Sequence, residues 1–521
     1  MERSSGVLLS ISSLPGPYGI GTLGRSAYEF TDFLEKAGQR FWQILPLGPT
    51  GYGDSPYQSF STFAGNPYLI DLDMLVEDGL LTKEEVESRE WGGDPRHVDY
   101  GKIFVSRFEV LRIAARRGLA RDREAVEAFV RENERWLPDY ALFMACKLHN
   151  GLRAWTEWPE DIRKRWPEAM QRCREEYRED VEFYTYVQYL FFRQWNKLRE
   201  YIHGKGIKII GDVPIYVAMD SCDVWAETHF FQLDGDNIPL EVAGVPPDYF
   251  SEDGQLWGNP LYDWDAMRND GYGWWIRRID GASKLYDVIR IDHFRGFDTY
   301  WSVPYGAPTA KGGRWNKGPG MSLIGALKGW FPGLEFIAED LGAPMDSVVK
   351  LLKESEWPGM KVLEFAFDPK EPSNYLPHNH VPNCVCYTAT HDNCPLMQWK
   401  EDADEKSVAF AEKYLSIRDD EPFNWGVIRG GMGSVAKLFV GLMQDYLGLG
   451  RGHTMNNPGI PDGNWQWCLL PGEASDELAA QMLDMVKTYE RIELPKTEED
   501  GPVDENFLRQ QKYNADWNFG T

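Results

Sequence analysis

The strongest constraint on the fold is a series of short apolar segments separated by stretches in which apolar residues follow a helical spacing. Strands that alternate with helices favour a parallel sheet. We predict seven strands and an eighth, weakened by its glycines: Val7–Leu14, Phe41–Leu47, Lys208–Val217, Leu285–Phe297, Leu334–Leu341, Met360–Phe367, Asn383–Asp392 and, within Asp445–Asn456, the last. Eight strands with helical connections predict an α/β fold, a (β/α)8 TIM barrel.

The segment Leu285–Phe297 carries charge inside a predicted buried strand. Because side chains alternate between the faces of a strand, Ile289 and Ile291 share one face, and Arg290 and Asp292 share the other. Buried charge is costly unless it is paired or used. This segment alone therefore leaves two interpretations open, a self-neutralising ion pair and a functional site.

Four carboxylates fall near the ends of four predicted strands: Asp212, Asp292, Glu339 and Asp392. Active sites of barrel enzymes lie at the C-terminal ends of the strands. Four unrelated surface carboxylates would rarely all fall there, so the coincidence favours a site.

Paired carboxylates without a phosphate loop indicate glycosidic bond chemistry, in which one ionised carboxylate attacks and one protonated acid donates. We expect Arg290 to lower the pKa of Asp292 and the apolar residues before Glu339 to raise the pKa of that acid. Asp392 is expected to hydrogen-bond sugar hydroxyls.

Two competing motifs are weaker. Gly19, Gly21 and Gly24 match a dinucleotide fingerprint by letter, but the next strand does not end in the ribose-binding acid. We interpret them as a turn that leads into a helix over Ser26–Ala37.

Histidines and cysteines crowd between residues 378 and 394: His378, His380, Cys384, Cys386, His391 and Cys394. Their spacing does not match the usual zinc pairs, and Cys384 and Cys386 share one face of a predicted buried strand, where cysteine acts as a small apolar residue. We expect no metal and no organic cofactor.

Charge and cysteine content restrict the setting. The net charge is −26, which disfavours nucleic acid and anionic membranes as partners. The chain shows no targeting segment and no apolar run of membrane-spanning length. Seven cysteines, an odd number, suit a reducing cytoplasm. We expect a monomer or a homodimer.

The barrel is predicted to occupy residues 1–521 as one catalytic domain with three insertions. Residues 73–180 are expected to form a mainly helical subdomain, 218–278 a loop-rich binding subdomain, and 393–444 a helical segment. Trp257, in the Gly-rich second insertion, is either a sugar platform or a loop anchor, and Tyr57 carries the same alternatives.

Several long motifs resemble those of the 4-α-glucanotransferases, also called amylomaltases or disproportionating enzymes, which are relatives of the α-amylases. They run almost end to end: SLPGPYGIG from Ser13, GDSPYQSFSTFAGNPYLIDL from Gly53, GDVPIYV from Gly211, PPDYFSEDGQLWGNPLYDW from Pro246, RIDHFRGF from Arg290, AEDLG from Ala338 and THDN from Thr390. The resemblance implies transfer of α-1,4-glucan segments to glucose or another glucan, with retention, no cofactor, and cyclic glucans as further products. It also implies a chain without the C-terminal β domain of the α-amylases.

The same resemblance implies roles. Asp292 matches the family nucleophile, Glu339 the acid/base and Asp392 the transition-state stabiliser. Residues that match the subsite of the cleaved glucose are Asp212, Arg290, His293 and His391, while Ser55, Tyr57, Gln255, Trp257 and Asn456 match glucan-contacting positions. Tyr52 is similar to an aromatic residue of a secondary glucan site.

The chain departs from the family at Cys394–Met397, at Thr454 and at Cys468. A hydrolase that uses the same carboxylates and a non-catalytic glucan-binding protein remain as alternatives. The products formed from maltotriose distinguish all three.

Overall fold

A computed structural model gives the fold, and it describes residues 2–247, 251–342, 345–458, 460 and 462–492. Eight parallel strands close into a barrel and follow each other around it in chain order. They are β1 (Ser4–Leu8), β2 (Phe41–Gln43), β3 (Lys208–Pro214), β6 (Val288–Asp292), β9 (Glu335–Ala338), β10 (Gly359–Val362), β11 (Cys384–Tyr387) and β12 (Leu438–Leu442). The predicted (β/α)8 barrel is therefore confirmed.

Seven of these strands lie within or next to the predicted segments, but the eighth prediction was wrong. Residues 445–456 do not form it; the strand is Leu438–Leu442, just before the helix Met443–Tyr446, and it falls inside the stretch expected to be helical. A β-carbon on Gly441 would lie 2.4 Å from the ring of Tyr446. Close packing against Tyr446 therefore requires the glycine inside the actual strand.

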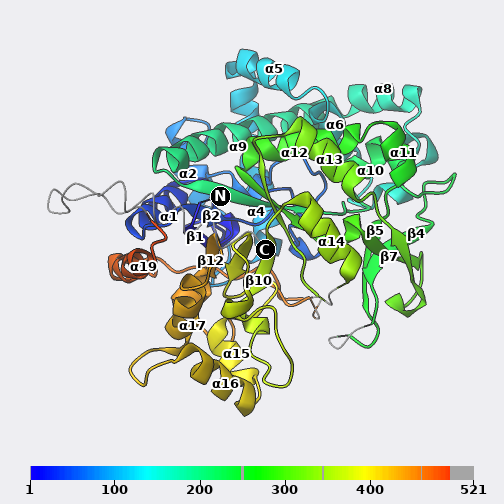
Figure 1. Ribbon diagram of the computed structural model, residues 1–521. Helices are drawn as coiled ribbons and strands as arrows, with labels where there is room; N and C mark the ends of the chain where they lie inside the picture. The colour runs from blue at the N-terminus through cyan, green and yellow to red at the C-terminus, as the bar shows by residue number, and fades with distance from the viewer. Residues whose placement is uncertain (1, 248–250, 343–344, 459, 461, 493–521) are drawn as a thin grey trace.

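Helices surround the barrel (Figure 1). They are α1 (Arg25–Lys36), α2 (Leu72–Glu77), α3 (Lys83–Glu87), α4 (Tyr100–Arg121), α5 (Arg123–Glu132), α6 (Leu137–His149), α7 (Glu160–Arg163), α8 (Pro167–Glu176), α9 (Arg178–Gly204), α10 (Cys222–Ala226), α11 (Trp264–Asn269), α12 (Gly273–Leu285), α13 (Met321–Trp330), α14 (Asp346–Ser355), α15 (Leu396–Asp402), α16 (Glu405–Leu415), α17 (Phe423–Met432), α18 (Met443–Tyr446) and α19 (Asp476–Thr488). Among the described residues no helix combines the length and apolar character needed to cross a membrane.

A second, four-stranded antiparallel sheet lies beside the barrel, at the right of Figure 1. Its order is β5 (Gln255–Pro260), β4 (Glu241–Val245), β7 (Thr299–Pro304) and β8 (Arg314–Lys317). The range 218–278 therefore holds regular strands where loops were expected, and β4 of this range pairs with β7, which follows β6. Asp248–Phe250, within the PPDYF motif, lie outside the described residues.

Two apolar layers fix the strands. Inside the barrel, Val288, Ile337 and Val362 pack together, whereas Ile289 and Ile291 belong to the larger core between strands and helices. The alternation predicted for β6 is confirmed, and it directs Arg290 into the barrel.

The Gly-rich segment Gly19–Gly24 leads into α1, as interpreted from the sequence. Gly24 is the residue before the helix, and a β-carbon there would lie 1.9 Å from the carboxylate of Asp71. Close approach of that carboxylate explains the glycine without a nucleotide.

Candidate active site

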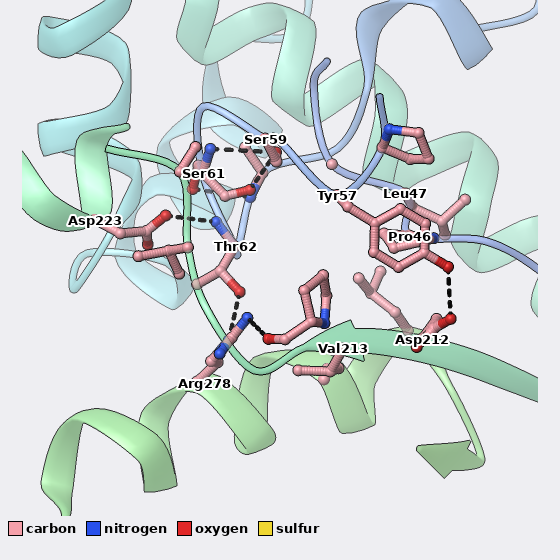
Figure 2. A pocket seen from close by; sticks show the side chains of 18 of the residues that line it. Pro46, Leu47, Tyr57, Ser59, Ser61, Thr62, Asp212, Val213, Asp223 and Arg278 are labelled. Atoms are coloured by element: carbon pink, nitrogen blue, oxygen red, sulfur yellow. Dashed lines mark hydrogen bonds between the residues drawn. The ribbon is translucent and has the colours of Figure 1, made fainter. Parts of the chain in front are cut away.

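An open cleft of about 1130 Å³ lies at the C-terminal ends of the strands. The predicted site residues that line it are Ser55, Tyr57, Gln255, Trp257, Arg290, Asp292, His293, Glu339, His391, Asp392 and Asn456. Asp212 lies beneath, inside β3 rather than at its end, and lines the small adjoining cavity of Figure 2. The strands thus bring together residues that are up to about 400 positions apart in the chain.

Arg290 connects two carboxylates below the cleft. In the parallel ladder Arg290 pairs with Asp212, so the two side chains enter the barrel together. The Nη1 of Arg290 lies 2.6 Å from Asp212 Oδ2 and 3.0 Å from Asp292 Oδ1. The ion pair that the sequence left open does form, but it extends to a third residue and to the wall of the cleft.

The pKa of Asp292 depends on more than the charge of Arg290. Burial raises its pKa to about 6, and although Arg290 lowers it, the charges of Asp212 and Asp392 raise it further. Arg290 lowers the pKa of Asp292 as predicted, but the net shift is upward, because burial and two neighbouring carboxylates outweigh one guanidinium. Near neutral pH Asp292 is still mostly ionised.

Glu339 directly follows β9. Burial and the charge of Asp292 raise its pKa to about 7, which confirms the predicted direction. Backbone N–H groups of His293 and Leu341 each donate to one carboxyl oxygen at 2.8 Å and oppose the shift. His293 reaches this position in a left-handed conformation, with φ of 55°. Between about pH 6 and 7 the site can therefore hold an ionised Asp292 and a protonated Glu339.

Asp392 lies in the turn after β11, and its pKa is lowered, whereas those of Asp292 and Glu339 are raised. Burial alone would raise its pKa, but His391 and Asn456 lower it to about 2. The Nε2 of His391 is 3.3 Å from one carboxylate oxygen, and the Nδ2 of Asn456 donates to the other at 2.6 Å. Asp392 is thus a fixed negative charge facing the cleft.

Aromatic side chains form the walls. The ring of Tyr57 stacks on His391 with centroids 5.1 Å apart, and its hydroxyl donates to Asp212 at 2.7 Å. The ring of Trp257 meets His293 edge-on at 4.8 Å. Trp257 lies on strand β5 and not in a loop, so the loop prediction for this segment was wrong. The side chain of Tyr52 lies outside what the structure describes.

Sequence reasoning missed the wall beyond β10. It consists of Glu364, Phe365, Phe367, Trp399 and Ser407, from the end of β10 and from α15 and α16. The sequence did hold a signal for this wall, because the sixth predicted strand also has a carboxylate, Glu364, near its end. Burial raises the pKa of Glu364 to about 8, and Cys394 Sγ donates to its Oε1 at 3.1 Å.

The remaining departures from the family lie elsewhere. Thr454 Oγ1 donates to Gln398, and buried Cys468 lies against the carbonyl of Ser12. Cys384 and Cys386 are buried in the layer between strands and helices. Within the described part of the chain, no three His, Cys, Asp or Glu side chains are grouped to hold a metal ion.

A closed parallel barrel with a protonated acid and two ionised carboxylates around an open cleft is the arrangement of enzymes that break and remake glycosidic bonds. Comparison with known proteins narrows this class. The sequence profile of the family described as 4-alpha-glucanotransferase matches residues 9–471. The chain belongs to the 4-alpha-glucanotransferase family, and it is an enzyme that disproportionates α-1,4-glucans.

Relatives match over nearly the full chain. A 4-alpha-glucanotransferase from Clostridium butyricum is 48% identical over 489 residues, 93% of this chain and 100% of the relative. One from Thermus thermophilus is 47% identical over 503 residues, 94% of this chain and 100% of the relative. The structure of an amylomaltase from Streptococcus agalactiae in complex with acarbose is 42% identical, with a TM-score of 0.92, and the match covers 94% of this chain and 100% of that one.

Proposed function

We propose that transfer proceeds by double displacement with Asp292 as nucleophile and Glu339 as acid/base. Asp292 attacks C1 of the donor glucan, the bond from C1 to the leaving O4 breaks, and Glu339 gives its proton to that oxygen. In the second step Glu339 takes the proton of an acceptor 4-hydroxyl, whose oxygen attacks C1 and releases Asp292. Two inversions retain the α configuration.

The observation that carries this proposal is the order of the two pKa values, about 6 for Asp292 and about 7 for Glu339. An ionised nucleophile beside a protonated acid is the state that the first step needs. Arg290 supports it, because its guanidinium contacts Asp292 directly.

The other residues are assigned to the glucan. Asp392, held by His391 and Asn456, binds hydroxyls of the cleaved glucose and stabilises positive charge at its ring. Asp212, Arg290 and His293 shape the same subsite. Ser55, Tyr57, Gln255 and Trp257 line the cleft where the chain continues. Glucose or a second glucan accepts the donor, and attack by the donor's own far end gives a cyclic product.

Incubation with maltotriose tests the proposal. Transfer gives glucose together with a ladder of longer chains, and Asp292→Asn removes both, because no covalent intermediate can form. The exposed Asp265, paired with Arg268 on α11, provides the matched control Asp265→Asn, which keeps full activity. Shortened products alone mean hydrolysis, and unchanged turnover in Asp292→Asn contradicts the assigned nucleophile.

We also propose that the enzyme works in the cytoplasm as a monomer or homodimer. All seven cysteines are free thiols, which suits a reducing compartment. Light scattering coupled to gel filtration measures the mass, and a larger assembly contradicts this part.

A further inference from the structure

Arg278 is a buried cation outside the cleft. It extends from α12, is 2% exposed, and takes part in no ion pair with a described residue. Burial lowers its pKa, and the nearby Asp223 and Tyr262 oppose that shift. A buried guanidinium without a paired carboxylate is costly, so its hydrogen bonds must satisfy it.

Three of its four acceptors lie on two separate segments (Figure 2), and the fourth is the hydroxyl of Tyr262, at 3.3 Å. The Nε of Arg278 donates to Thr62 Oγ1 at 2.9 Å, on the loop after β2. Its two terminal nitrogens donate to the carbonyl oxygens of Pro214 and Ile215, at the end of β3. Figure 2 shows the guanidinium between these segments, with Thr62 on one side and the strand on the other.

These two segments carry the partners of one hydrogen bond at the cleft. Tyr57, five residues before Thr62, donates its hydroxyl to Asp212 Oδ2 at 2.7 Å, and Asp212 lies two residues before Pro214. Asp212 in turn contacts Arg290, which contacts Asp292. A change in the spacing between loop and strand therefore reaches the nucleophile through hydrogen-bonded groups.

We propose that Arg278 is a positioning residue for transfer, which holds the loop of Tyr57 against the strand of Asp212 and so sets the hydrogen bond between them. The inference rests on the proposed roles of Asp212 at the cleaved glucose and of Tyr57 as a glucan-contacting residue.

The chemistry of the contact requires arginine. A planar guanidinium reaches these four oxygens in fixed directions, whereas a lysine ammonium offers no such fork. The guanidinium also lies over the ring of Trp275, 4.8 Å from its centroid, which fixes its plane. A second bond steadies the loop from the other side, because Asp223 Oδ2 accepts from the backbone N–H of Thr62 at 2.8 Å.

Thr62→Val tests the proposal with little risk to the fold. It removes the hydroxyl that Arg278 contacts, keeps the shape of the side chain, and changes no residue that lines the cleft. The variant is made in the natural enzyme and in a Tyr57→Phe background, and kcat and KM for maltotriose disproportionation are measured in both. Thr309→Val, whose hydroxyl does not cap the helix after it, is the control.

We expect Thr62→Val to lower kcat about fivefold or more in the natural enzyme and less than about twofold in the Tyr57→Phe background, since coupled residues are not additive. Arg278→Lys follows the same pattern with a larger loss. Equal losses in both backgrounds, or no loss in the natural enzyme, overturn the proposal. Absence of longer products from the natural enzyme would instead contradict the transferase reaction itself.

Discussion

Asp212→Asn removes one of the charges that raise the pKa of the nucleophile Asp292, and so measures the contribution of that charge. Asp212 Oδ2 and Asp292 Oδ1 lie 2.6 and 3.0 Å from the same nitrogen of Arg290, so the two oxygens are at most about 5.6 Å apart. Two unit charges at that distance repel by about 3 kcal/mol at an effective dielectric constant near 20. This energy equals about two pKa units.

The neutral amide should therefore move the pKa of Asp292 from about 6 to about 4. Asp292 attacks only when ionised and Glu339 donates only when protonated, so kcat/KM of the natural enzyme should form a bell with limbs near the two pKa values, about 6 and about 7. In the variant the acidic limb shifts down by about two pH units, while the alkaline limb stays, because burial and the charge of Asp292 are the main causes that raise the pKa of Glu339.

The measurement is the pH profile of kcat/KM for maltotriose, with Asp265→Asn as a charge-matched control far from the cleft. The absolute rate falls, since Asp212 also bonds Tyr57. An acidic limb that moves by less than about half a pH unit would refute the electrostatic reasoning.

Three further variants test other contacts. Asn456→Ala should lower kcat by about five- to thirtyfold, because Asp392 loses a hydrogen bond to a charged oxygen, and steady-state kinetics measures this. Glu364→Gln should stabilise the fold, and the gain should increase as pH rises from about 4.5 to 8. The reason is that a carboxyl whose pKa is about 8 in the folded state and ordinary in the unfolded state makes the natural protein less stable as pH rises across this range. The measurement is the difference in melting temperature between variant and natural enzyme, and a difference that does not grow across this range contradicts the prediction. Arg491→Met should lower the free energy of unfolding by about 3 kcal/mol or more, measured by denaturant titration, because the buried guanidinium bonds carbonyls at both Ser4 and Met432; kcat should not change.

The barrel was predictable from sequence because its strands are local apolar runs of the right length. Asp292 could be placed because Ile289 and Ile291 fix the faces of β6. The sheet around β5 was not predictable, since the pairing of β4 with β7 joins segments more than 50 residues apart and the glycines near β5 are typical of a loop. Gly254, directly before β5, and Gly258, within β5, both adopt positive φ. These two glycines are the reason why the sequence predicted a loop here.

The acidity of Asp292 was also beyond local reasoning. The sequence shows Arg290 two positions away, and its lowering effect is present in the structure. The opposing charges of Asp212 and Asp392 come from β3 and from the turn after β11, and burial comes from the whole barrel. A pKa depends on all its neighbours, and most of these are distant in the chain.

Because side chains alternate along β6, its odd-numbered residues face the helices and its even-numbered residues face the inside of the barrel. Ile289 and Ile291 contact the helices and belong to the stability of the molecule, whereas Arg290 and Asp292 point inward and belong to its chemistry. Under selection for heat resistance, one apolar residue can therefore replace another at the odd positions. Turnover is preserved as long as the residues at the even positions stay unchanged. A saturation library of this strand should show two interleaved patterns of tolerance, one readable by survival of the fold and the other by the products formed.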